Sequence, residues 1–119
     1  MIRIDQVVLT GILCEDQQED AGTGDPDDIY IKIGQDQGHD KAFWKDKKFV
    51  QGDYYKINRE VHYNEKICLF EKDDHGDDGL IGCVEFSDAD GVNTLQHLNG
   101  SNARYIMYFL LTKEDYPTS

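Results

Sequence analysis

Asp27-Asp28-Ile29-Tyr30-Ile31-Lys32-Ile33 is the segment that indicates the architecture most directly, because isoleucine fills every second position from Ile29. Alternation with a period of two places every second side chain on the same face of a β-strand, so the three isoleucines share one face. We therefore predict a half-buried strand over residues 29–33.

The rest of the chain repeats this strand signature. Its apolar segments are short, rich in β-branched and aromatic residues, and separated by Gly, Asp and Asn clusters. The other predicted strands cover 2–14 (one strand, or two with a break), 49–50, 54–57, 60–63, 67–70, 80–86 and 105–112. Only 90–100 is predicted as a short helix, because Val92, Leu95 and Leu98 are three residues apart. About eight strands at this length predict one all-β domain over 1–119, an antiparallel β-sandwich.

Charge narrows the classes of function. The formal net charge is −12, with 24 Asp and Glu against 12 Lys and Arg, so a nucleic-acid binder is not expected. Cations or basic partners are favoured instead. No apolar run is long enough for a transmembrane segment, and the first residues lack the apolar core of a secretory signal, which favours a cytoplasmic location.

The cysteines and histidines form no zinc pattern. Cys14, Cys68 and Cys83 are far apart, with no CxxC and no histidine at zinc-finger spacing. Cys68 and Cys83 each lie inside an apolar run, which favours buried thiols in a reducing setting, although a bridge between two of the three stays open.

Acidic residues concentrate in two segments. Five carboxylates fall within the eight residues 71–78, between two apolar runs, which is the composition of a calcium loop because calcium takes six to eight oxygen ligands. A solvated acidic hairpin tip is the alternative. A second segment, 15–28, holds seven acids and no Lys or Arg. If both segments lie at the same end of the sandwich, a cation would relieve their mutual repulsion; at opposite ends, each is a solvated turn.

Two motifs resemble the calcium-binding C2 domains. Residues 27–33 are similar to the Ser-Asp-Pro-Tyr-Val-Lys-Val run of that family, and Glu71-Lys72-Asp73 with Asp78-Gly79-Leu80-Ile81-Gly82 resembles its third calcium loop. The resemblance implies an eight-stranded sandwich whose loops meet at one end and chelate Ca²⁺. The metal ligands that it implies are Asp28, Glu71, Asp73, Asp78 or Asp77 in its place, and Asp20 or Asp25.

This sequence departs from the C2 pattern at several positions. Ile29 replaces the family proline, Glu71 replaces an aspartate, and Gly22 stands where the other first-loop aspartate is expected. For that reason Asp20 or Asp25 would have to serve. Both acidic segments also lack the apolar tips that insert into lipid, so cation binding is better supported than conventional membrane docking.

A rival calcium pattern starts at Asp74. Residues 74–85 place Asp, Gly and Glu at most ligand positions of an EF-hand loop, ending at Glu85. That motif needs a helix on each side, whereas 67–70 and 83–86 read as strands. Both patterns predict the same metal.

The segment 41–49 carries a third of the positive charge, with aromatic residues between the lysines. In C2-like domains, a lysine-rich strand near this position can hold anionic lipid head groups. The candidate lipid- or partner-binding residues are Lys41, Trp44, Lys45, Lys47 and Lys48. The simpler interpretation is that the aromatic residues belong to the core and the lysines offset acidic neighbours.

No catalytic constellation is recognisable. The chain has no Gly-x-Ser-x-Gly elbow, no phosphate loop and no Cys–His pair at a known spacing, so we expect a protein that is not an enzyme. Two functions remain. One is a calcium-binding C2-like module that binds a protein partner or an anionic lipid, and the other is a metal-free acidic module that docks on a basic partner.

Overall fold

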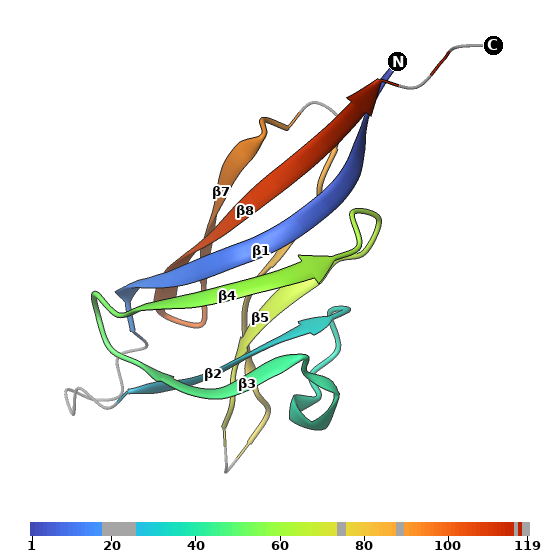
Figure 1. Ribbon diagram of the computed structural model, residues 1–119. Coiled ribbons are helices and arrows are strands. Elements are labelled where there is room, and N and C mark those ends of the chain that lie inside the picture. The colour runs from blue at the N-terminus through green and yellow to red at the C-terminus, as the bar shows by residue number, and fades with distance from the viewer. Residues whose placement is uncertain (18–25, 74–75, 88–89, 116, 118–119) are drawn as a thin grey trace.

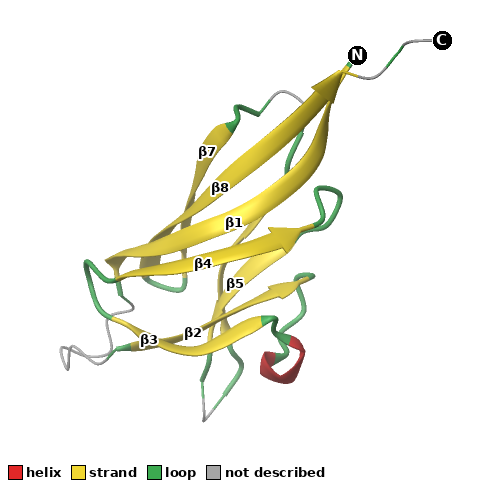
Figure 2. Cartoon of the chain, in the orientation of Figure 1, coloured by secondary structure: helices red, strands yellow, loops and turns green. Residues whose placement is uncertain are grey.

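The computed structural model describes residues 1–17, 26–73, 76–87, 90–115 and 117. These residues form an all-β sandwich of eight strands in two antiparallel four-stranded sheets, as predicted (Figures 1 and 2). The strands are β1 (Ile2–Asp16), β2 (Asp27–Ile33), β3 (Trp44–Phe49), β4 (Tyr54–Val61), β5 (Ile67–Glu71), β6 (Gly79–Val84), β7 (Asn93–Gly100) and β8 (Ala103–Asp115), with a 3-10 turn η1 (His39–Lys41) after β2.

The first sheet has the strand order β4-β1-β8-β7, and the second sheet has the order β3-β2-β5-β6. Figure 1 shows β7, β8, β1 and β4 side by side, with the long strands β1 and β8 running together to the two chain termini. This two-sheet antiparallel arrangement is compatible with a C2-like fold. Among the described residues, no helix is long and apolar enough to cross a membrane.

The core lies between the two sheets and follows the alternation read from the sequence. Ile29 and Ile31 are buried in it, and Tyr30 lies on the other face of the second sheet, stacked on Phe70. The long strand β1 contains a register shift between Leu9 and Gly11. The shift reverses the phase of its alternation, so its core positions cannot be extrapolated from one half of the strand to the other.

The predicted helix over 90–100 is wrong, because this segment holds β7. Residues 93–100 pair with β8 along the whole of β7. Leu98 is buried in the core whereas Leu95 is half exposed, which is the arrangement of a strand and not of one apolar helix face. The spacing of three was ambiguous, because so small a number of apolar residues fits both the helical period of 3.6 and the strand period of two. Pairing with the neighbouring strand decides between helix and strand.

The favoured interpretation of Cys68 and Cys83 as buried thiols is wrong, and the alternative of a bridge between two of the three cysteines is the one observed. Cys68 and Cys83 form a disulfide, and they lie directly opposite each other on the paired strands β5 and β6. Disulfides persist in oxidising settings, so the cysteines no longer support the prediction of a reducing environment. Cys14 is a free, buried cysteine, and burial raises the pKa of its thiol to about 11.

Candidate functional site

The strand pairing brings the flanks of the two acidic segments together. Ile29 near the start of β2 lies opposite Glu71 at the end of β5. The backbone N–H of Lys72 donates to the carbonyl oxygen of Asp28 at 2.7 Å. Both segments therefore leave the second sheet at the same end, as the C2 resemblance implies. The first loop itself, including the candidate ligands Asp20 and Asp25, lies outside the described residues, and so does Asp74 of the EF-hand pattern.

The β3–β4 and β7–β8 turns complete this end of the sandwich. The β3–β4 turn bonds to the end of β1, because the N–H of Gly52 donates to the carbonyl of Cys14 at 2.8 Å. Ser101 of the β7–β8 turn lies against Gly79, whose backbone leaves no room for a Cβ. We call this region the acidic end. Its described acids are Asp16, Asp27, Asp28, Asp53, Glu71, Asp73, Asp77 and Asp78, and its described cations are Lys48, Lys72 and Arg104.

Hydrogen bonds from the protein hold the acids of the β5–β6 loop. The carboxylate of Asp78 accepts from the Tyr30 hydroxyl at 2.5 Å and from the backbone N–H of Asp73 at 2.9 Å. Gln37 links two neighbours, because its Nε2 donates to Asp77 at 3.1 Å and its Oε1 accepts from the N–H of Asp78 at 2.8 Å. Protein donors therefore occupy ligand oxygens that the calcium prediction assigned to a metal.

Asp28 differs from these acids. One of its carboxylate oxygens, Oδ2, lies 3.2 Å from the Lys48 ammonium in a half-exposed ion pair. Its other oxygen, Oδ1, is buried and has no hydrogen-bond partner among the described residues. A buried carboxylate oxygen without a partner is unusual, because its desolvation is not offset by any bond.

The predicted calcium ligands that lie among the described residues are not grouped on one side of the sheet. Glu71 lies opposite Ile29, so both point to the inner side of the second sheet, whereas Asp78 reaches Tyr30 on the outer side. Within the described ranges, no three His, Cys, Asp or Glu residues are grouped so that they could hold a metal ion. The described part of the chain therefore does not fit a calcium site by itself.

Asp27 has a structural role that the sequence analysis missed. It is only 2% exposed, and it accepts a hydrogen bond of 2.7 Å from the Tyr105 hydroxyl of β8. Burial and this bond to Asp27 raise the pKa of Tyr105. The bond joins the start of β2 to the opposite sheet directly below the acidic loops. Nothing in the sequence distinguishes Asp27 from the adjacent Asp28, because the partner of Asp27 is 78 residues away.

The lysine-rich segment is mostly the edge strand β3, and its aromatic residues face the core. Trp44 is partly buried and packs edge-on against Phe49 and Tyr55. Lys45 and Lys47 are half-buried on β3, and Lys48 pairs with Asp28. Lys41 lies apart from them on η1, where it lines a cavity of about 420 Å³ with Lys32, Lys72 and His39. The predicted lipid-binding set therefore does not form a single surface.

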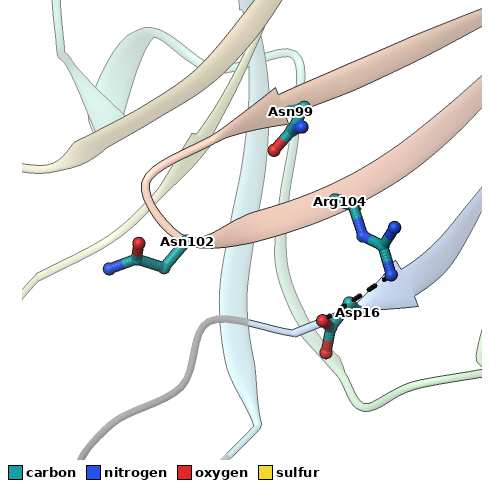
Figure 3. A pocket seen from close by; sticks show the side chains of 4 residues that line it. All are labelled: Asp16, Asn99, Asn102 and Arg104. Atoms are coloured by element: carbon teal, nitrogen blue, oxygen red, sulfur yellow. Dashed lines mark ion pairs between the residues drawn. The ribbon is translucent and has the colours of Figure 1, made fainter.

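An open polar cavity of about 510 Å³ lies at the acidic end (Figure 3). It is lined by Asp16, Asn99, Asn102 and Arg104, which come from β1, β7 and the β7–β8 hairpin. The Arg104 guanidinium is 3.9 Å from the Asp16 carboxylate, and Figure 3 shows the two side chains facing each other. No signal in the sequence joins these residues, because only the fold brings their strand ends together.

Tyr30 allows a pH test of the contact that anchors Asp78. Burial, and then the bond to Asp78, raise the pKa of Tyr30 from 10.0 to about 12. A raised folded-state pKa contributes stability below the unfolded value and loses it as the pH rises through the folded value. We expect the Tyr30→Phe variant to be less stable than the wild type below pH 10, and the difference to shrink between pH 10 and 12.

Urea unfolding at a series of alkaline pH values measures this difference. Tyr63→Phe is the matched control, because Tyr63 is half exposed in the β4–β5 turn. A difference between wild type and Tyr30→Phe that stays constant across this pH range would contradict the role given to the hydroxyl.

Comparisons with known proteins identify no family. No protein-family model matches the chain, and no curated protein is a significant match. The C2 resemblance therefore stands on its two motifs and on the two-sheet architecture.

Proposed function

We propose that the protein is an interaction module with a C2-like sandwich fold, and that its acidic end docks a basic segment of another protein without a metal. One observation carries the proposal: Asp77 and Asp78 of the β5–β6 loop are positioned by Tyr30, Gln37 and the backbone N–H of Asp73. A surface that is organised before binding loses less conformational entropy when its partner arrives.

The charge of this end supports a cationic partner. Eight described acids and three described cations lie there, and Asp73 and Asp77 are exposed at its rim. Lys and Arg side chains of a partner would be attracted to such a surface, which raises the association rate and favours basic sequences over others. Partners of the same acidic character would be repelled.

Calcium binding is the second candidate, and the unsatisfied Oδ1 of Asp28 favours it. A hard cation placed against that oxygen would supply the missing partner, with Asp73 and the first-loop acids Asp20 and Asp25 as the remaining candidate ligands. Two observations argue against calcium binding. The Lys48 ammonium already lies beside Asp28, and hydrogen bonds from the protein already occupy the Asp78 carboxylate.

Thermal unfolding separates the two candidates. We expect the melting temperature to be the same in EDTA and in millimolar CaCl2 at matched ionic strength, because a cation that is not bound acts only through screening. A ligand at 100 times its dissociation constant would stabilise the fold by about 2.7 kcal/mol. A rise specific to Ca²⁺ over Mg²⁺ that Asp28→Asn abolishes would replace the metal-free proposal by the calcium one.

A further inference from the structure

The outer face of the first sheet is apolar over its centre. The strand registers place three rows of side chains there, directed away from the core. We call this surface the apolar face; its members are Val8, Thr10, Leu13, Tyr54, Leu95, Ile106, Tyr108 and Leu110. Tyr54, Leu95 and Leu110 are 53%, 50% and 41% exposed, which is unusual for three large side chains on one face of a sheet.

The apolar face is also hollowed. A cavity of about 250 Å³ is lined by Leu95, Tyr108 and Leu110 together with the polar side chains of Thr10 and Asn93. Tyr54 packs edge-on against Tyr108, and it lies across Gly11, where any Cβ would collide with its ring. The tyrosine pair therefore forms a ridge beside the cavity. This shape suits a partner surface that also has a ridge next to a hollow.

Charge is the feature that selects the occupant. The chain has 24 acids, yet among the described residues in these three rows Glu60 is the one carboxylate, and Lys56 lies near it on the same strand. At the end of the third row, His97 lies 3.4 Å from the Glu15 carboxylate of the next row. A basic partner would be drawn to the acidic end and not to this face. An anionic membrane would bring negative charge to the contact itself, where it would be repelled by this acidic chain. A second copy also carries a net charge of −12, but charges more than about 8 Å from the contact are largely screened at physiological salt. A second copy meeting the same face brings together few acids and places Lys56 and Glu60 of each copy at the interface.

We infer that the apolar face is where two copies of the chain pack against each other. Homodimers with two-fold symmetry are the commonest oligomers, and they use the same surface on both subunits. Four strands about 4.8 Å apart and about 20 Å long give a projected area on the order of 400 Å² per copy, which is small for a stable interface. The dimer is therefore weak and depends on concentration, and it leaves both acidic ends exposed.

Sedimentation equilibrium of the full chain tests this inference. Over loading concentrations from about 10 to about 500 µM, where interfaces of modest affinity become populated, the weight-average mass should rise from 13.7 kDa towards twice that value. The double variant Leu95→Glu, Leu110→Glu should stay at 13.7 kDa, with its dissociation constant raised at least tenfold. It should also remain folded by circular dichroism, because both side chains point outward.

Tyr63→Glu is the matched control, since Tyr63 is 50% exposed like Leu95 but lies in the β4–β5 turn. It should dimerise like the wild type. A wild-type mass that stays at 13.7 kDa over the whole range would overturn the inference. So would equal losses of dimer in the control and in the double variant, because the association would then not use the apolar face.

Discussion

The Tyr105→Phe variant is expected to be less stable than the wild type by about 2 kcal/mol, the usual range for losing a buried hydrogen bond to a carboxylate. The hydroxyl of Tyr105 donates to Asp27, which is 2% exposed. Removing the donor leaves a buried carboxyl group without this bond, and water has little access to replace it. The loss should appear as a lower urea midpoint with an unchanged dependence on denaturant.

Tyr63→Phe again supplies the control, because it removes a tyrosine hydroxyl from an exposed turn. Its effect should stay within about 0.5 kcal/mol, as for most surface substitutions. Similar losses in both variants would show that the Tyr105–Asp27 bond contributes no more to the free energy of unfolding than an exposed tyrosine hydroxyl does. The bond would then not be what fixes the start of β2 below the acidic end.

Removal of the disulfide is expected to have a larger effect. Replacing both Cys68 and Cys83 by alanine should lower the free energy of unfolding by about 3 kcal/mol, the loop-closure value for a cross-link over about 15 residues. The two cysteines are 15 residues apart in the sequence. The bridge lies on the outer side of the second sheet, in the same small cluster as Tyr30 and Phe70. Its loss should therefore also weaken the packing under the Tyr30–Asp78 contact.

Thiol titration combined with urea unfolding measures this effect. The native protein should show no reactive thiol, since Cys14 is buried, and the unfolded protein should show one before reduction and three after it. Reduction of the wild type should give the stability of the double variant. Three thiols in the unfolded, unreduced protein, or a stability unaffected by reduction, would contradict the bridge.

The two-sheet fold could be predicted from the sequence because its main signal is local. The alternation of Ile29, Ile31 and Ile33 is visible within five residues, and the other strands repeat it. The errors arose where pairing partners decide the outcome. Residues 93–100 became a strand because β8 lies beside them, and Cys68 became bridged because the β5–β6 register places Cys83 opposite.

The candidate site was predictable in part for the same reason. The acids of 71–78 are recognisable by composition, but their common end with Asp28 followed only from the C2 resemblance. The hydrogen bonds that hold Asp77 and Asp78 come from Gln37 and Tyr30, which are about 40 or more residues away. Sequence alone cannot distinguish a set of metal ligands from a loop held by hydrogen bonds when the hydrogen-bond partners are that distant in sequence. The apolar face could not be predicted from the sequence, because its residues come from four separate strands.

The most direct test of a metal-free docking end is the binding of a fluorescent octalysine peptide, followed by anisotropy in EDTA. The key variant is Asp73→Asn, Asp77→Asn, which removes two charges from the rim of the acidic end while keeping the side-chain shapes. The matched control is Glu85→Gln, Glu114→Gln, which removes two exposed charges near the opposite end of the strands. Both variants carry the same net charge, so a difference between them reports position.

We predict that the peptide binds in EDTA and that added CaCl2 weakens binding no more than matched salt does. The key variant should lose at least fivefold more affinity than the control, which corresponds to a local loss of binding free energy of about 1 kcal/mol. Equal losses in the two variants would contradict the account, since attraction would then come from net charge alone. Binding that requires Ca²⁺ would contradict it as well, because the acidic end would then be a metal site.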